Sequence, residues 1–526
     1  MGCGITARMS PAQPPPSDLP SRRQCLRTAA AFGVWSATPA FVRHARAADA
    51  PRFSLGVASG YPRPDSVVLW TRVMGDDLPE QVSVHWEVAL DEAFQHIVQQ
   101  GRETAQAQWA HSVHAQPRGL EPSRPYWYRF TALGDQSRIG RTQTAPDPSA
   151  SGAVQELKFA IGSCQRWDWG HYAAWRDITA FDPHLVVFLG DYIYEYATAV
   201  GALRSVDGGR IDTLAGYRDR YRQYKSDPAL QAAHAQCPWI MVWDDHEVEN
   251  DYAGAVSPRR PADFGAQRAA AYQAYWEHMP FPASWRPRGA HMRVYSHLDW
   301  GRLGRFLLLD DRQYRDPQAC PIPGWGGSQR ISPHTCAQLL DPKRSLLGAA
   351  QEQWLAQSWS HEHRWNFLAQ QTLMAPMSVR NARDEPTVWS DGWDGYPASR
   401  ERVLQSASQQ QVRGLVVLGG DIHAHCVARL HAQPSDMRSA VIGSEFCGTS
   451  ISSRGPSQSS MERARAENPH LLYGEARKRG SILFRVDAQH LRADLRGVDN
   501  VRDPQSPVRS EARFTVDARQ PGPVPA

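Results

Sequence analysis

The sequence lacks a long apolar segment: no stretch reaches the roughly 18 uninterrupted apolar residues of a membrane-spanning helix. It also lacks a strong excess of either charge, since 58 Lys and Arg stand against 54 Asp and Glu, a formal net charge of +4. Its eight cysteines show no zinc-finger spacing, and we find no internal repeat. These absences argue against a stable membrane span, a zinc finger and a repeat protein.

The chain is too long for one ordinary hydrophobic core. Its 526 residues, of which 41% are hydrophobic and 19 are tryptophan, predict two to four domains with a large buried interior.

The amino terminus has the composition of a targeting segment. The sequence SRRQCLR carries adjacent arginines at Arg22 and Arg23, a weakly apolar run follows over residues 28–42, and ARA at 45–47 offers small residues for cleavage. This resembles a twin-arginine signal, with Cys25 where that signal usually has Phe. A basic N-terminus of no significance is the alternative. We expect residues 1–47 to direct export by the twin-arginine translocase and the mature protein to be periplasmic or secreted.

Export would change the charge of the chain. Residues 1–47 hold six arginines and one aspartate, so their removal takes the net charge from +4 to about −1. The mature chain then has no basic footprint for nucleic acid.

Six cysteines remain after such processing. Cys320 and Cys336 lie in one Pro- and Gly-rich segment and could close a short loop by a disulfide in an oxidising compartment, although two unpaired thiols fit the sequence nearly as well.

The remaining chain divides into two parts. Residues 51–146 contain short β-rich runs separated by Pro, Gly and Asp, and the piece GLEPSRPYWY resembles the tyrosine corner of immunoglobulin-like and fibronectin-III sandwiches, so we expect an all-β domain there. Residues 155–515 alternate β-rich and helical stretches, with helices expected at 265–278 and 348–361, which indicates an α/β domain. Residues 516–526, which include QPGPVPA, look disordered.

Four apolar strand-like runs in the α/β part end in residues that can bind metal. They are LKFAIGSC, LVVFLGD, WIMVWDD and LVVLGGD, which end at Cys164, Asp191, Asp245 and Asp421. In open α/β sheets the ligand site lies beyond the carboxyl ends of the strands. The segment WDDHEVEND adds five carboxylates within eight residues, an arrangement that is costly unless a cation offsets the repulsion.

The donor types at these ends are mixed. A thiol, a phenol and imidazoles suit a transition metal, whereas carboxylates suit hard cations such as Ca²⁺, Mg²⁺ or Mn²⁺. Taken singly, each piece also fits an ordinary turn, an inert buried cysteine or a solvated acidic face. The repeated strand-then-ligand pattern favours a metal cluster over these readings.

These motifs carry a family resemblance. GSC, LGDYIYE, WDDHEVENDYAG, DDRQYR, DGWDGYPASR and GGDIHAH, with FSLGVASGYPRPDSVVLWTRV near the front, resemble the PhoD-type alkaline phosphatases, which belong to the calcineurin-like metallophosphoesterases. The resemblance runs from about Phe53 to beyond His425. It implies a four-layer αββα metallophosphoesterase sandwich preceded by an immunoglobulin-like domain, an Fe³⁺ and Ca²⁺ site, and activity on phosphate mono- and diesters.

The resemblance also assigns residues. It places the metal ligands at Cys164, Asp191, Tyr194, Asp245, Asp421 and His423. Which of Asp244 and Asp245 touches metal stays open. It places His246 beside the phosphate.

A water-derived hydroxide activated by metal would attack the ester without a protein nucleophile. His246 or Arg312 would stabilise the leaving group, although Arg312 could instead form a structural ion pair with Asp310 or Asp311. A role in phosphate acquisition follows for an exported enzyme. The alternatives are a phosphodiesterase or phospholipase-D-like enzyme acting on phospholipid or a cell-wall polymer, a non-catalytic metal-binding protein, and a redox metalloprotein.

Overall fold

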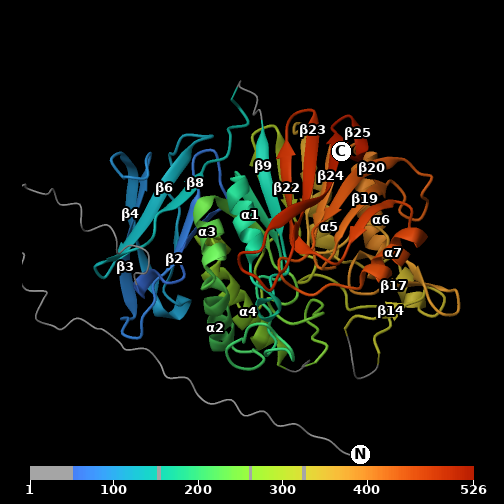
Figure 1. The fold of residues 1–526 in the computed structure, drawn as a ribbon, viewed down its shortest axis with the longest axis horizontal. Helices are drawn as coiled ribbons and strands as arrows, with labels where there is room; N and C mark the ends of the chain where they lie inside the picture. The colour runs from blue at the N-terminus through green and yellow to red at the C-terminus, as the bar shows by residue number, and fades with distance from the viewer. Residues whose placement is uncertain (1–50, 151–155, 260–262, 323–326) are drawn as a thin grey trace, which may run out of the picture. The chain divides into compact units, whose positions relative to one another are not determined.

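The computed structural model describes residues 51–150, 156–259, 263–322 and 327–526, and the expected export signal lies outside them. Two large sheets form the centre of the molecule (Figure 1). They pack face to face through a shared aromatic core, in which Phe159 of one sheet lies 5.3 Å from Phe306 and 5.2 Å from Phe367 of the other, measured between ring centroids. The described core is therefore mixed α/β.

The first sheet has ten strands. Three neighbouring parallel strands, β9 (Leu157–Gly162), β10 (Leu185–Leu189) and β11 (Pro238–Val242), form its middle. Antiparallel strands β22 (Arg479–Val486), β23 (His490–Val498), β24 (Val508–Asp517) and β25 (Gln520–Pro525) continue it on one side. On the other side β1 (Val57–Gly60) pairs in parallel with β11, and β2 (Val68–Arg72) and β5 (Ser112–Ala115) follow it in antiparallel pairs.

The second sheet has seven strands in the order β12 (Ser296–Trp300), β13 (Gly304–Leu308), β15 (Trp365–Ala369), β18 (Leu415–Gly419), β20 (Val441–Cys447), β19 (His425–His431) and β21 (Leu471–Glu475). Strands β13, β15, β18 and β20 run parallel. Strands β15 and β18 are buried along their whole length, as is typical of strands covered on both faces.

Helices complete the core. α1 (Ala173–Phe181), α2 (Leu214–Lys225), α3 (Pro228–Gln236) and α4 (Phe264–His278) pack on the first sheet and its loops, α5 (Gly348–Ser358) and α6 (Pro397–Gln409) on the second, and α7 (Gln458–Glu467) lies beside β21. Both expected helices are present, the one at 265–278 as α4 and the one at 348–361 as α5, which ends three residues early, at Ser358. A small sheet of β14 (Arg330–Ile331), β17 (Pro386–Trp389) and β16 (Val379–Arg380) lies at one end. No helix in the described ranges has the length and hydropathy to cross a membrane.

The N-terminal β region is joined to this core more closely than the sequence suggested. Its own sheet contains β4 (Ile97–Gln106), β3 (Gln81–Ala89), β6 (Pro125–Ala132) and β7 (Asp135–Gln136), with β8 (Gly140–Gln143) paired to β6. Strand β1, however, pairs with β11 of the ten-stranded sheet, so Ser59 lies opposite Pro238. Because β1 is buried along its whole length, it needs a strand partner on each side. Within the segment GLEPSRPYWY, the Tyr126 hydroxyl accepts from the Glu121 amide at 2.8 Å.

The prediction of a disordered tail over 516–526 is wrong. Residues Gln520–Pro525 form β25 at the edge of the ten-stranded sheet, where Phe514 lies opposite Pro525. Proline is tolerated on an edge strand because one side of the strand needs no ladder bonds. The sheet therefore extends ten residues beyond the boundary expected at 515.

The cysteine alternatives are resolved in favour of a bond: Cys320 and Cys336 form a disulfide, and Cys164, Cys237, Cys426 and Cys447 are free and buried.

Candidate metal centre

The candidate ligands stand at the carboxyl ends of parallel strands from both sheets. Cys164 follows β9, Asp191 follows β10, Asp245 follows β11 and Asp421 follows β18. Cys164, Asp191, Asp421 and His423 all have positive φ, between 54° and 62°. A left-handed conformation costs a residue other than glycine roughly 1–2 kcal/mol, so the surrounding structure must hold these four turns in place.

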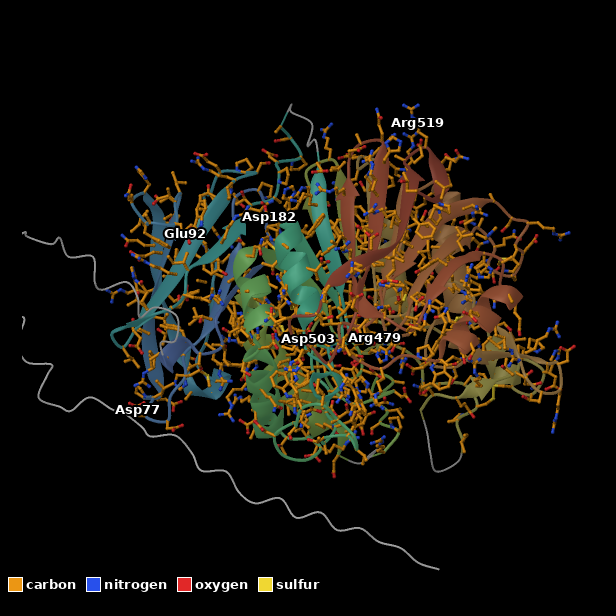
Figure 2. The ribbon with its side chains drawn as sticks, viewed as in Figure 1. Asp77, Glu92, Asp182, Arg479, Asp503 and Arg519 are labelled. Carbon is orange, nitrogen blue, oxygen red and sulfur yellow. A yellow bond between two sulfur atoms is a disulfide. The ribbon has the colours of Figure 1, made fainter. Side chains whose placement is uncertain are left out.

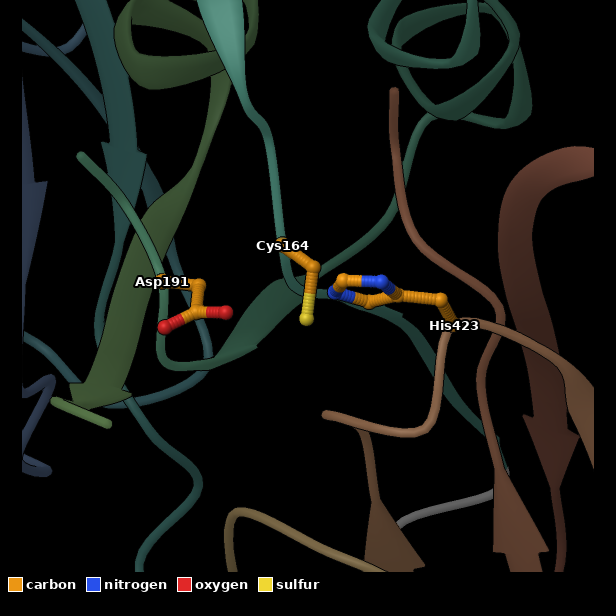
Figure 3. A group of neighbouring side chains, drawn as sticks. All are labelled: Cys164, Asp191 and His423. Carbon is orange, nitrogen blue, oxygen red and sulfur yellow. The ribbon is translucent and has the colours of Figure 1, made fainter. Parts of the chain in front are cut away.

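The first group of ligands combines sulfur, oxygen and nitrogen. Figure 3 shows the side chains of Cys164, Asp191 and His423 converging from three separate loops, and their ligand atoms all lie within 4.8 Å of one another. The Tyr194 hydroxyl joins them, at 2.8 Å from Asp191 Oδ2 and 3.3 Å from His423 Nε2. The structure thus brings together four of the six residues expected to bind metal.

The protonation of His423 suits it to this role. Its Nδ1 lies 2.6 Å from the Arg454 carbonyl oxygen, a contact that requires Nδ1 to carry the proton. Nε2 is then left with its lone pair, facing Tyr194. Burial lowers the pKa of His423 to about 4, so the ring is neutral near pH 7 and available as a ligand.

Hydrogen bonds fix the neighbouring loop. Ser453 Oγ donates to the Tyr194 hydroxyl at 2.8 Å, and Arg479 Nη1 donates to the Ser453 carbonyl at 2.7 Å. Arg479, labelled in Figure 2, begins β22, so the first sheet anchors this loop.

The remaining groups contain mostly carboxylates. Asp191 lies with Asp245 and His246 in one group and with Asp244 and Asp421 in another. Asp191 therefore belongs to three groups, the position expected of a carboxylate that bridges two cations. The sequence did not decide whether Asp244 or Asp245 contacts metal, and the structure places both of them in these groups.

A third carboxylate group was missed by the sequence analysis. Asp245, Asp251 and Asp391 offer oxygen atoms within 4.8 Å of one another. Asp251 stands in WDDHEVEND, where it was not assigned a role, and Asp391 opens the DGWDGYPASR motif. Ser328 donates to Asp251 Oδ2 through both its amide, at 3.0 Å, and its hydroxyl, at 2.7 Å.

Several buried oxygen atoms in these groups have no hydrogen-bond partner within the described residues: Asp191 Oδ1, Asp244 Oδ2 and Asp245 Oδ1. Buried carboxylate oxygens without a partner are costly unless a cation binds them. Burial and neighbouring carboxylates raise the pKa of Asp191, and burial raises that of Asp244, well above the usual range. The residues present therefore fit a group of bound cations, with the mixed donors of Cys164, Tyr194 and His423 suited to a transition metal and the carboxylates to hard cations.

His246 lies against this centre. Its Nδ1 is 2.8 Å from Glu195 Oε2, and its ring packs on Tyr194 with centroids 4.1 Å apart. Burial alone would lower the pKa of His246, but the charges of Asp191, Asp245 and Glu195 raise it well above the usual value. A protonated imidazole near a substrate is a proton donor. Glu195, a buried residue of LGDYIYE, is the orienting partner that the sequence did not identify.

Arg312 is also within the centre. Its buried guanidinium makes close ion pairs with Asp244 and Asp391, and Nη2 lies 3.9 Å from Asp421 Oδ2 with no hydrogen-bond partner among the described residues. The suggested alternative of an ion pair with Asp310 or Asp311 is wrong: Asp310 accepts from the Arg312 backbone amide, at 3.1 Å. Nη2 is left as a free donor.

A hollow of about 390 Å³ opens onto these side chains, with Asp191, His246 and Asp421 in its lining and Trp389 and Trp393 beside them. It provides the space for a small ester.

Cation binding here should depend on pH. In the metal-free protein burial raises the pKa of Asp251 and of Asp421 to about 6. Because these folded-state values lie above the ~3.9 of an unfolded aspartate, the stability of the metal-free protein falls as pH rises through roughly 4 to 6. A cation needs the ionised carboxylates, so its affinity rises over the same range. We expect Ca²⁺ to raise Tm by several degrees at pH 7.5 and hardly at all at pH 5, measured by calorimetry against EDTA-treated protein. An equal gain at both pH values would contradict this.

Comparisons with known proteins agree with this geometry. A family model described as PhoD-like phosphatase matches residues 159–495, and a second, for the N-terminal domain of PhoD-like phosphatases, matches residues 36–146. Alkaline phosphatase D of Bacillus subtilis (strain 168) is 41% identical over 487 residues, covering 89% of this chain and 82% of that protein. A solved structure of PhoD is 40% identical with a TM-score of 0.85, covering 90% of this chain and 92% of that one.

Proposed function

The chain belongs to the PhoD-like phosphatase family and is a phosphoric ester hydrolase of the alkaline phosphatase type; on that premise we propose that it is an exported enzyme that hydrolyses phosphate mono- and diesters with Fe³⁺ and Ca²⁺. We also propose that the α/β core is a four-layer αββα metallophosphoesterase sandwich and that the N-terminal β region is an immunoglobulin-like domain preceding it. One observation carries the chemistry, the convergence of Cys164, Asp191, Tyr194 and His423 on one point beside a cluster of carboxylates.

The residues divide between two kinds of cation. Cys164, Tyr194 and His423 would hold iron, and Asp191 would reach both metals. Asp245 and Asp421 would hold calcium, with Asp244, Asp251 and Asp391 beside them. When bound, these cations supply Lewis-acid activation of the attacking water and neutralise charge on the phosphate.

The side chains that touch the ester have separate tasks. His246, held by Glu195 through Nδ1, presents Nε2 to the hollow and gives its proton to the leaving oxygen. Arg312 keeps two of its nitrogens on Asp244 and Asp391 and offers Nη2 to a phosphate oxygen. Because both side chains are held by carboxylates before substrate binds, little reorganisation is needed during the reaction.

Export and phosphate acquisition complete the proposal. Support for export comes from the paired arginines Arg22 and Arg23, the apolar run after them and the small residues at 45–47. The Cys320–Cys336 disulfide is consistent with an oxidising compartment.

The test is hydrolysis of a chromogenic phosphomonoester and of the matching diester by the purified protein, with and without added Ca²⁺. We expect both to be cleaved, with activity lost in a chelator and restored by Ca²⁺. A thiolate- or phenolate-to-iron absorption band should also be visible and should diminish in Tyr194→Phe. Failure to cleave either ester in any metal state would reject the ester-hydrolysis proposal, and a colourless active protein containing only zinc would reject the iron.

A further inference from the structure

A second hollow, of about 540 Å³, lies outside the metal centre and shares no lining residue with the first. Its wall comes from Arg63 between β1 and β2, from the short helix Ala283–Trp285 and the segment that joins it to β12, from the start of β12, and from Trp354 of α5. We call it the arginine pocket and define it by Arg63, Arg286, Arg288 and Arg293 with the aromatic residues Trp285 and Tyr295.

The charge of the arginine pocket is not balanced. Its lining contains four arginines and two histidines and no Asp or Glu. Within the described ranges none of the four guanidinium groups makes an ion pair. Burial lowers the pKa of His297, which is part of the lining, and the carboxylate of Asp299 lies close enough to oppose that shift. That carboxylate is already bound by Arg305, whose Nε and Nη2 donate to it at 2.7 and 2.9 Å. Uncompensated cations gathered in a concave surface attract anions, because the walls focus their field.

Two of the four guanidinium groups are positioned by aromatic rings, and neither donates a hydrogen bond to any residue that the structure describes. Arg293 lies over the ring of Tyr295 at 4.3 Å, and Arg286 lies over Trp109 and Trp276 at 4.5 and 4.8 Å. Stacking of this kind holds the plane of the guanidinium and leaves the N–H groups free. Burial lowers the pKa of Arg286 with no carboxylate to oppose it. An arriving oxyanion would supply the missing counter-charge and accept from these donors.

The arginine pocket adjoins the loop that carries Arg312. Met292, in its lining, exchanges two bonds with the Gln313 side chain: its amide donates to Oε1 at 3.3 Å and its carbonyl accepts from Nε2 at 2.8 Å. Gln313 Nε2 also donates to Asp310 Oδ2 at 3.0 Å, and Asp310 accepts from the Arg312 amide. Residues 310–313 are thus bonded on one side to the wall of the arginine pocket and, through Arg312, to the carboxylates of the metal centre.

From this we propose that the arginine pocket is an accessory binding site for a linear polymer of phosphate groups, which it grips while another phosphate of the same chain occupies the metal centre. The inference rests on the proposed function. Phosphate is the anion that matches the guanidinium fork and the ester chemistry of the neighbouring site. The repeated phosphates can be joined directly, as in inorganic polyphosphate, or through alcohols, as in a phosphodiester polymer. Because several guanidinium groups share one pocket, they favour a chain of phosphate groups over a single small anion.

The test compares two double variants of the metal-loaded enzyme. Arg288→Gln with Arg293→Gln removes two exposed cations of the arginine pocket, and Arg102→Gln with Arg118→Gln removes two exposed cations of the N-terminal β region that line neither hollow. Fluorescence anisotropy, read immediately after mixing and before the polymer is hydrolysed, gives Kd for a labelled polyphosphate and for a labelled phosphodiester oligomer of equal charge. We expect the pocket variant to raise Kd for at least one polymer about tenfold, in line with the loss of charge-assisted contacts, and the control variant to leave it within about twofold.

Small-ester turnover separates this inference from the proposed function. The kcat/KM for a chromogenic phosphomonoester should be unchanged in both double variants, which also shows that they are folded. The polymer whose Kd responds identifies the linkage. Equal Kd values in the two variants, no binding of either polymer to the wild type, or equally tight binding of polyglutamate would each overturn the accessory site, even with small-ester hydrolysis intact.

Discussion

Replacing Asp191 with asparagine is expected to lower kcat for phosphomonoester hydrolysis by at least about a thousandfold, equivalent to roughly 4 kcal/mol of transition-state stabilisation. Asp191 belongs to three of the four ligand groups, and one of its carboxylate oxygens is buried without a hydrogen-bond partner within the described chain. An amide has the same shape but one neutral oxygen in place of two charged ones, so it cannot bridge two cations. Metal content by elemental analysis should fall together with kcat.

Asparagine is the informative substitution because it separates chemistry from folding. Position 191 has a φ of 60°, which Asn adopts about as readily as Asp, whereas most other side chains would add strain. The amide of residue 191 also donates to Glu247 Oε2 at 3.1 Å, and this bond remains in the variant. Glu401→Gln, an exposed position on α6, is the matched control and should behave as wild type.

The same substitution should have the opposite effect on the metal-free protein. Burial and the charges of Asp244 and Asp245 raise the pKa of Asp191, which means that its ionised form is unfavourable without a cation. Removing that charge relieves the repulsion, so in EDTA at pH 8 the Tm of the variant should equal or exceed that of the wild type. Added Ca²⁺ should raise Tm less than it does in the wild type. A variant that keeps wild-type kcat and metal content would show that Asp191 is not a ligand.

The part of the centre that could be predicted from sequence is the part that follows one local rule. Cys164, Asp191, Asp245 and Asp421 each come directly after an apolar strand, and parallel strands bring their ends to one edge. The helices and buried strands of the core could be predicted for a similar reason, because each has its own local spacing of apolar residues.

The part that could not be predicted depends on loops meeting in space. Asp251 and Asp391 are 140 positions apart, neither directly follows a buried strand of the large sheets, and Ser328 contacts Asp251 from a third loop. Likewise, the Arg312 guanidinium pairs with Asp244 and Asp391 instead of the neighbouring acids that the sequence suggested. Strand pairings of β1 and β25 were missed for the same reason: the partner strands are far away in the chain, and Pro- and Gly-rich sequence hid an edge strand.

Arg312→Lys is expected to lower kcat/KM for a phosphomonoester by about a hundred- to a thousandfold, the range found when a preorganised donor to a developing charge is lost. The guanidinium pairs with Asp244 and Asp391 and still has Nη2 free. A lysine ammonium is a single point, so it cannot hold both carboxylates and also face the substrate. The variant should also lose roughly 3–5 kcal/mol of stability in the metal-free state, because it leaves a buried carboxylate uncompensated.

Arg315→Lys provides the control that distinguishes catalysis from packing. Arg315 is equally buried and donates to Asp391 Oδ1 at 2.8 Å, but its other bonds go to the carbonyls of Tyr252 and Asp391, so that, unlike Arg312, it keeps no nitrogen free for a substrate. It should therefore lose a similar amount of stability, measured by denaturant unfolding. Its loss of activity should come through misplacement of Asp391 and be restored by saturating Ca²⁺. Activity of Arg312→Lys should stay low at any Ca²⁺ concentration, since a donor to the phosphate is missing; full rescue by Ca²⁺ would mean that Arg312 acts only by holding the carboxylates.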